Sequence, residues 1–224
     1  MIYIDPLDRA STPWDSSQSL ERNLEEGLYK NDWGRVFTAI ILGATHSSSY
    51  QNGAIPALHK AIADHAPHIA LALLELGCDP NIQAIAHDAV TPLHVAVSAR
   101  DPITIRNLLQ HKADPNMRDA SGSTPIHGAA CGTEYESARA LLNSGAEINA
   151  LNNAGETPLH NALKFDADYK MLRILVDAGA DVNQRDNSGL SCLELAKRTS
   201  HAAHAAIQES KRMSVGQSHD RNTQ

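Results

Sequence analysis

Apolar residues along the chain recur at the spacing of short amphipathic helices. The segment from Leu20 reads LERNLEEGLYKND and continues as WGRVFTAIILGAT, with a polar turn at Asn31 and Asp32 between the two parts. Further along, each apolar stretch closes with a pair of aliphatic residues, at Leu73-Leu74, Leu108-Leu109, Leu141-Leu142 and Leu175-Val176. This periodicity predicts an all-α chain built from pairs of short helices.

One four-residue motif opens several of these helix pairs. Thr-Pro-Leu-His begins at Thr91, Thr-Pro-Ile-His at Thr124 and Thr-Pro-Leu-His at Thr157, so the motif returns after 33 residues each time. Related starts lie 35 residues earlier at Pro56 and 34 residues later at Ser191. A period in the low thirties is typical of an array of stacked supersecondary units.

The end of each unit follows a shared pattern as well. A residue suited to the left-handed backbone conformation ends the second helix, an asparagine follows in the loop, and a glycine marks a tight hairpin turn before the next unit. These residues are Gly77, Lys112, Gly145 and Gly179, then Asn81, Asn116, Asn149 and Asn183, then Gly122, Gly155 and Gly189. Lys112 stands where the other units have glycine, and Ala89 stands at the first hairpin glycine position.

The combination of Thr-Pro-Leu-His, Leu-Leu, Gly-Ala-Asp-x-Asn and a turn glycine resembles the ankyrin repeat. The resemblance covers roughly residues 53–208 and implies an ankyrin-repeat solenoid of stacked helix-turn-helix units joined by hairpin-like loops. We expect the array to span 19–211, with a degenerate first repeat over 20–52 and repeats from about 53, 88, 121, 154 and 188. An extended or disordered segment over 1–18 is expected before it, and a disordered tail over 212–224 after it.

The motif itself is predicted to be a helix start. Thr91 suits the N-cap, Pro92 suits the first helical position, and His94 falls where a side chain can reach back to the cap. Thr124, Pro125 and His127, and then Thr157, Pro158 and His160, occupy the same positions. The last unit reads Ser191-Cys192-Leu193-Glu194, with a glutamate in place of the histidine. A capping role tolerates that exchange, whereas a catalytic imidazole would not.

A metal site is the alternative interpretation of His59, His94, His127 and His160. Stacked helices lie about 8–10 Å apart, whereas a shared zinc ion requires Zn–N distances of about 2.0–2.1 Å. We therefore predict no metal and no other cofactor. The sequence also lacks a phosphate-binding loop, a dinucleotide-binding glycine motif and a nucleophile elbow, so we predict that the protein is not an enzyme.

Composition narrows the partners further. Of the 224 residues 42% are hydrophobic but only 4% aromatic, which favours a core of small aliphatic side chains. The net charge of −7 and the absence of an obvious basic patch argue against direct binding of nucleic acid or an anionic membrane. The cysteines are Cys78, Cys131 and Cys192, an odd number without a C-x-x-C pair, which favours a reducing, cytoplasmic location, with a nuclear location left open.

The resemblance implies binding of a protein partner through hairpin tips and inner helices. The family's variable contact positions correspond here to His87, Asp88, Val90, Ser98 and Ala99, to Ala120, Ser121, Ser123, Cys131 and Gly132, to Asn153, Ala154, Glu156, Lys164 and Phe165, and to Asn187, Ser188 and Leu190. Phe165 is one of two phenylalanines and lies in an inserted turn, where it could contact a partner or instead fold under to fill the turn. The resemblance also implies that some loop asparagines are hydroxylated, but capping of the hairpins suffices to account for these residues and is the favoured interpretation.

We therefore predict a monomeric, non-enzymatic scaffold or adaptor for an unidentified protein partner. The alternative is a transcriptional co-regulator of the inhibitor type that acts on a nuclear partner. An acidic surface is compatible with a basic partner of that kind.

Overall fold

The computed structural model describes residues 20–41, 56–85, 87–199 and 205. The sequence predictions for 1–18, 42–52 and 212–224 lie outside these residues. The described helices are α1 (Leu20–Tyr29), α2 (Trp33–Ile41), α3 (Ala57–Ala63), α4 (Pro67–Glu75), α5 (Pro92–Ser98), α6 (Pro102–Gln110), α7 (Pro125–Ala130), α8 (Tyr135–Asn143), α9 (Pro158–Lys164), α10 (Tyr169–Asp177) and α11 (Cys192–Thr199).

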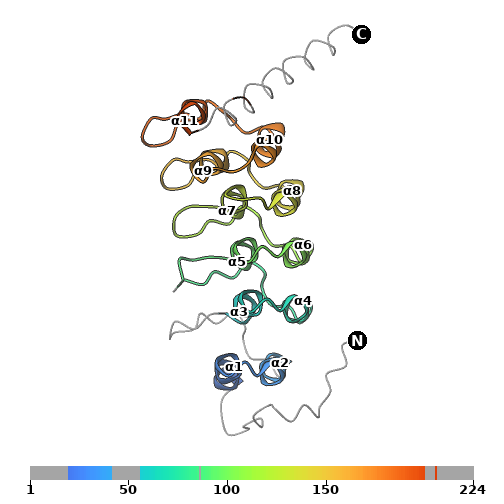
Figure 1. Cartoon of the computed structure of the whole chain (residues 1–224). Helices are drawn as coiled ribbons and strands as arrows, with labels where there is room; N and C mark the ends of the chain where they lie inside the picture. Colours follow the sequence, from blue (N-terminus) through green and yellow to red (C-terminus); the bar gives the residue numbers. More distant parts are fainter. Residues whose placement is uncertain (1–19, 42–55, 86, 200–204, 206–224) are drawn as a thin grey trace.

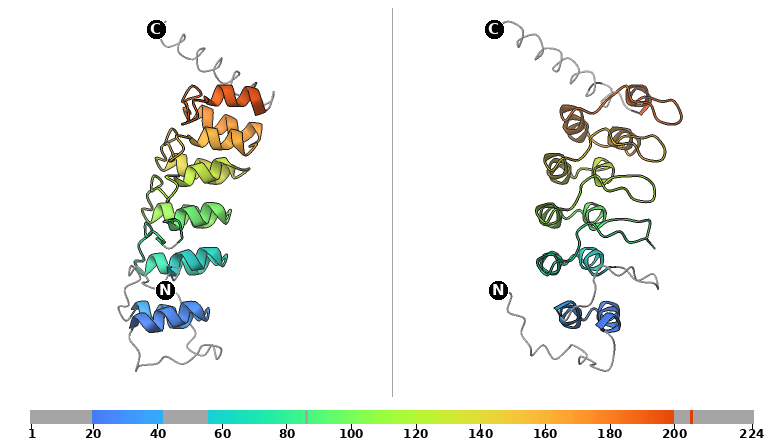
Figure 2. Two further views of the ribbon diagram at one scale, coloured as in Figure 1. Left: turned by 90° about the vertical axis from the view of Figure 1, so that its left-hand side faces the viewer. Right: turned by 180° about the vertical axis from the view of Figure 1, so that it is seen from behind.

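The helices stack in two parallel columns (Figure 1). The first helices of the repeats contact one another in the order α3, α5, α7, α9 and α11, and the second helices in the order α4, α6, α8 and α10. The α1–α2 pair lies at the N-terminal end of the stack (Figure 2). The helices that begin after Thr91, Thr124 and Thr157 are therefore neighbours, and the predicted all-α ankyrin-type stack is confirmed.

Loops project from the first-helix side of the stack (Figure 1). Two of them close with isolated antiparallel bridges, Ala84 with Val90 and Arg185 with Ser191. Asp88 and Ala89 both adopt the left-handed conformation, with φ of 54° and 51°. Ala89 therefore takes the conformation that glycine takes in the later hairpins, at some cost in backbone strain.

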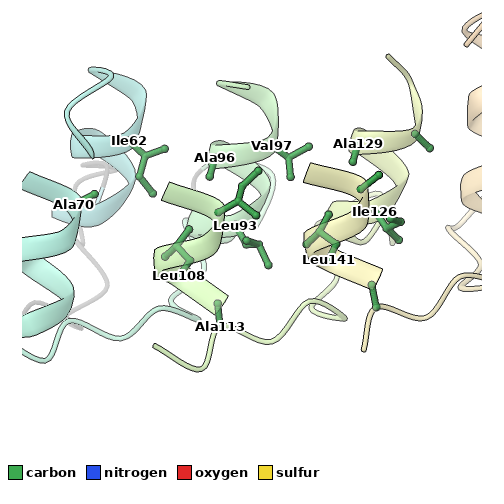
Figure 3. Close-up of a cluster of buried hydrophobic side chains, with 14 of the residues drawn as sticks. Ile62, Ala70, Leu93, Ala96, Val97, Leu108, Ala113, Ile126, Ala129 and Leu141 are labelled. Atoms are coloured by element: carbon green, nitrogen blue, oxygen red, sulfur yellow. The ribbon is translucent and has the colours of Figure 1, made fainter. Parts of the chain in front are cut away.

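A continuous core of small aliphatic side chains runs between the layers (Figure 3). Leu93, Ile126 and Leu159 of the first helices and Leu108 and Leu141 of the second helices are all 0% exposed. The alanines at 96, 129 and 162 are equally buried and let neighbouring helices approach closely. Because each layer is completed only by its neighbours, the repeats stabilise one another.

A buried polar contact joins α1 and α2. The Arg35 guanidinium, 5% exposed, donates to Asn23 Oδ1 from Nε at 3.0 Å and from Nη2 at 2.6 Å. Its Nη2 also lies 3.1 Å from the Glu26 carboxylate. A buried arginine is tolerable only when its donors are satisfied in this way, so these residues determine how the first pair closes.

Lys112 ends α6 in the same backbone conformation that glycine provides in the other repeats. Its φ is 69°, compared with 87° at Gly77 and 88° at Gly145. The turn therefore keeps its shape, and the lysine bears the strain of a left-handed residue with a Cβ atom.

Candidate interaction surface

The Thr-Pro-x-His motifs form the predicted helix caps. In each motif the Nδ1 atom of the histidine accepts a hydrogen bond from the backbone N–H of the threonine, at 3.3 Å for His94, 3.1 Å for His127 and 3.1 Å for His160. The threonine Oγ1 lies 2.9 Å from the same Nδ1 in all three. The capping interpretation of these residues therefore agrees with the geometry.

The other ring nitrogen of each histidine binds the next repeat. Nε2 lies 3.0 Å from the carbonyl oxygen of Ser123 for His94, and 3.1 Å from that of Glu156 for His127. His160 makes the same contact with Leu190 at 3.2 Å. A carbonyl oxygen can only accept, so Nε2 carries the proton and Nδ1 is the acceptor.

The two roles leave these imidazoles without a free nitrogen for metal ligation or proton transfer. Burial is the largest cause of a lowered pKa at His94 and His127, opposed by the bonds to Ser123 and Glu156. Both rings are thus held neutral near pH 7. Within the described parts of the chain, no three histidine, cysteine or acidic side chains are grouped in a way that could hold a metal ion.

In the last motif, a glutamate takes the place of the histidine and caps the helix in the same way. Glu194 Oε2 accepts from the Ser191 backbone N–H at 3.0 Å and lies 3.0 Å from Ser191 Oγ. These bonds, led by the one from the Ser191 backbone, and then Arg185 lower the pKa of Glu194 to about 2. A carboxylate can cap a helix but cannot donate to a carbonyl, so Glu194 serves only the first of the two roles.

A thiol lies beside one of the histidines but has no nucleophilic character. Cys192 Sγ is 3.2 Å from His160 Nδ1. The cysteine is 0% exposed, and burial raises its pKa to about 12. A thiolate is the reactive form, so this contact is a packing interaction inside the stack.

Asparagine side chains join the loops of successive repeats. Asn81 Nδ2 donates to the carbonyl oxygen of Lys112 at 3.2 Å, and Asn81 Oδ1 accepts from the Asp114 backbone N–H at 2.7 Å. Asn116 and Asn149 make the corresponding pairs of bonds with the following loop. The predicted capping of the hairpins by these three asparagines is wrong, because they bind the loop of the next repeat at the end of its second helix.

The hairpin tips are joined edge to edge. Backbone N–H groups of one tip donate to carbonyl oxygens of the tip before it: Ala120 to Asp88 at 2.7 Å, Asn153 to Ser121 at 2.9 Å, and Asn187 to Ala154 at 3.0 Å. The side chains of Asn153 and Asn187 add bonds to the carbonyl oxygens of Ala120 and Asn153. Most of the predicted tip residues, namely His87, Asp88, Ala120, Ser121, Asn153, Ala154, Asn187 and Ser188, are exposed along this edge.

Glycine is required where two tips meet. Gly122 and Gly155 have φ of 75° and 72°. A Cβ atom on Gly122 would lie 2.4 Å from Asn153 Oδ1, and one on Gly155 would lie 2.4 Å from Asn187 Oδ1. The close contact between tips therefore depends on both the backbone conformation and the missing side chain.

Four predicted contact residues lie deeper than the tips. Val90, Ser123, Glu156 and Leu190 are half-buried, and each gives its carbonyl oxygen to the motif histidine of the preceding repeat. The Glu156 carboxylate also pairs with Lys164. These residues mainly join repeats, and their side chains offer less surface to a partner than the tips do.

The remaining candidates lie at the ends of the first helices, away from the tips. Ser98 is exposed, and Cys131 is half-buried with its thiol 3.2 Å from the carbonyl oxygen of His127. Lys164 pairs with Glu156 and lies 3.9 Å from Asp186. The Phe165 side chain is 65% exposed, so it does not fold under to fill the inserted turn.

Several exposed apolar residues were not among the predicted contacts. Ile85 in the first hairpin is 76% exposed, Leu151 in a later hairpin 39%, and Tyr169 at the start of α10 45%. Near Tyr169, the Tyr135 hydroxyl donates to Asp168, and Lys170 Nζ lies 4.0 Å from the centre of the Tyr135 ring. The step of 35 residues from Pro56 to Thr91, two longer than the step of 33 in the following repeats, was the available signal for Ile85.

The stack of joined hairpins and helix pairs defines a class of protein, a repeat-built solenoid that presents an extended surface. A family model described as ankyrin repeats (3 copies) matches residues 58–152, 93–186 and 129–209. The chain belongs to the ankyrin repeat family, whose repeats imply a role in protein–protein interaction and are typically non-catalytic. Among the described helices, none has the length and apolar character needed to cross a membrane.

The curated relatives each match only part of the chain. It is 42% identical over 69 residues to "Regulatory protein NPR5" of Arabidopsis thaliana. It is 40% identical over 68 residues to "BTB/POZ domain and ankyrin repeat-containing protein NPR5" of Oryza sativa subsp. japonica. A third relative, "BTB/POZ domain and ankyrin repeat-containing protein BOP" of Lupinus luteus, is 42% identical over 69 residues. The alignments cover 30% of this chain and 13% or 14% of each relative.

Proposed function

We propose that this chain is a non-enzymatic scaffold or adaptor that binds a protein partner through its hairpin tips and the exposed ends of its first helices. The observation that carries the proposal is the backbone ladder from Asp88 to Asn187, which holds the tips in fixed register. A surface ordered before binding loses little conformational entropy when a partner docks. Side chains along it are thus preorganised for recognition.

The composition of the tips supports a protein as the partner. Alanine, serine and asparagine side chains dominate the exposed positions, and the short polar groups of serine and asparagine make adaptable hydrogen bonds. Phe165 supplies an exposed aromatic ring at the far end of a first helix. Aromatic residues contribute a large share of the binding energy in many interfaces.

Affinity purification with quantitative mass spectrometry tests this proposal. The tagged chain is compared with the double variant Ala120→Arg/Ala154→Arg, which places bulky charges on two exposed tips. Ala178→Arg on the exposed end of α10 is the matched control. We expect a set of proteins that the wild type and the control retain and the tip variant loses. Equal recovery by all three proteins would contradict the proposed surface.

A second candidate function is regulation of transcription through a nuclear partner. One partial relative is named a regulatory protein, and the net charge of −7 suits a basic partner. Fractionation of cells that express the tagged chain distinguishes this candidate from a cytoplasmic adaptor. Strict exclusion from the nucleus would remove it.

A further inference from the structure

Three arginines occupy one position in successive second helices. Arg106, Arg139 and Arg173 are each the fifth residue of their helix, in α6, α8 and α10. These helices contact one another in that order, so the arginines form a column. The column lies on the second-helix side of the stack, whereas the hairpin tips project from the first-helix side (Figure 1).

A groove runs between α6 and α8 at the first two arginines. Arg106 and Gln110 lie on one side of it, Glu136 and Arg139 on the other, and the half-buried Leu109 and Ala140 form part of its lining. The groove therefore combines two guanidinium groups with an apolar floor. Arg173 contributes less, because it donates to the Tyr169 hydroxyl and pairs with Asp177 at 3.5 Å.

The charges in this groove are incompletely balanced. Arg106 pairs with Glu136 at 3.5 Å, and both side chains are largely exposed, at 52% and 76%. An exposed pair of this kind is weak and is readily exchanged for another carboxylate. Arg139 makes no ion pair with any described residue. A locally cationic groove thus lies in a chain whose net charge is −7.

We propose that this groove binds an acidic peptide segment of a protein partner, in the polyproline II conformation, with carboxylates three residues apart. Packed helices are separated by about 8–10 Å. A polyproline II segment has three residues per turn and a rise of about 3.1 Å, which places residues i and i+3 on one side about 9 Å apart. One carboxylate then pairs with Arg106 and the next with Arg139. A small apolar residue between them rests on Leu109 and Ala140.

Other occupants fit this groove less well. In a β-strand, residues i and i+3 point to opposite faces, and residues i and i+2 are separated by only about 7 Å. A nucleic acid presents a dense row of phosphates, which Glu136 and the overall negative charge would repel. This inference goes beyond the proposed function, because it concerns a different side of the molecule and a different kind of ligand.

Fluorescence anisotropy with a labelled peptide tests the assignment on the full chain. The probe is a synthetic peptide of repeated Glu-Pro-Ala, and the comparison peptide has the same composition with its glutamates in one block. We expect the repeated peptide to bind more tightly. Arg139→Gln should weaken binding about threefold to fivefold, because one charge-assisted contact is lost at an exposed site. Glu136→Gln should strengthen binding, because it frees Arg106 and removes a like charge.

Matched controls decide between this site and general charge attraction. Lys197→Gln removes a positive charge from the exposed end of α11 and should leave binding unchanged. The tip variant Ala120→Arg/Ala154→Arg should also bind the peptide normally, so this proposal and the proposed function fail separately. No detectable binding, equal binding of the block peptide, or equal losses with Lys197→Gln and Arg139→Gln would each overturn the assignment. Displacement of the peptide by a tighter-binding single-stranded DNA oligonucleotide would also overturn it and indicate a nucleic-acid site.

Discussion

The His94 imidazole links two repeats by donating from Nε2 to the carbonyl oxygen of Ser123 at 3.0 Å. Its Nδ1 meanwhile accepts from the Thr91 backbone N–H at 3.3 Å. One buried side chain therefore closes the start of its own helix and holds the hairpin of the next repeat. The same pair of bonds recurs at His127 and His160, so the repeating histidine is a connector between layers.

Truncation of a motif histidine should cause a large loss of stability. His127→Ala would leave the Thr124 backbone N–H and the Glu156 carbonyl oxygen without this partner in the interior. Each unsatisfied buried group costs about 1–3 kcal/mol, so we expect the free energy of unfolding to fall by roughly 2–4 kcal/mol. Urea denaturation followed by circular dichroism measures it. Ser98→Ala, at an exposed position, is the control and should change stability by less than about 0.5 kcal/mol.

Acid should destabilise the stack before most carboxylates titrate. Burial lowers the pKa of His59 to about 4, although its bond to Val90 opposes the shift. The unfolded chain takes up a proton below about pH 6.5 that the folded chain refuses. The contribution of neutral His59 to the free energy of unfolding is therefore fully present above pH 6.5. It is lost as the pH falls toward 4, by about 2 kcal/mol at pH 5.

Thermal melts at pH 7.5 and pH 5 test this dependence. The pKa values of His94 and His127 are lowered in the same direction and add to the loss. His59→Gln retains a donor for Val90 but does not titrate, so its melting temperature should depend less on pH than that of the wild type. An equal pH dependence in the two proteins would show that His59 does not contribute.

Because Pro56 precedes it, His59 makes only one of the two hydrogen bonds that the other motif histidines make. Its Nε2 lies 2.9 Å from the Val90 carbonyl oxygen, but Nδ1 has no partner among the described residues, because proline lacks both an N–H group and a hydroxyl. Pro56→Thr should be more stable than Pro56→Ala by about 1 kcal/mol, because only threonine adds a capping hydroxyl. Comparing the two variants cancels the loss of proline rigidity. Indistinguishable chemical denaturation midpoints would contradict the expected cap.

Lys112 and Gly145 form a matched pair for backbone strain. Both end a second helix with positive φ, 69° and 88°, and a Cβ atom on Gly145 would meet no atom of the described residues within 4 Å. Lys112→Gly should raise the melting temperature, since a non-glycine residue in this conformation costs about 1–2 kcal/mol. Gly145→Lys should lower it. Differential scanning calorimetry of both variants checks the opposite signs, and a fall for Lys112→Gly would exclude strain as the cause.

Substitution of Phe165 should affect partner binding without affecting stability. Because its side chain is 65% exposed, Phe165→Ala should change the free energy of unfolding by less than about 0.5 kcal/mol. Recovery of partners in affinity purification should fall if the ring contacts them. A large loss of thermal stability would instead assign the ring a structural role.

Much of the fold follows from local sequence. The spacing of Thr91, Thr124 and Thr157 set the period, and the choice of threonine, proline and histidine identified the first turn of each helix. Glu194 in the last unit already indicated a cap, since its carboxylate can replace the acceptor Nδ1 of a histidine. These features were predictable because a cap involves residues only three positions apart.

The second role of each histidine could not be predicted in this way. His94 binds a backbone carbonyl 29 residues away, and a carbonyl group is present at every position, so no residue type reveals it. The contact between Tyr135 and Asp168, 33 residues apart, was missed for a related reason. Neither residue belongs to the repeated motif, and only the stacking of α8 on α10 brings them together.

The sequence by itself determined the repeat period, the helix starts and the aliphatic character of the core, because these depend on short-range hydrogen bonds and on which residues avoid water. The tertiary structure alone decided which side chains join adjacent layers and which remain on the surface. It placed Phe165 outward, used the Ser123 and Glu156 carbonyl groups inside the stack, and aligned Arg106 with Arg139 across one groove. Those outcomes depend on how neighbouring repeats pack, and packing brings together residues that are one full repeat apart in the chain.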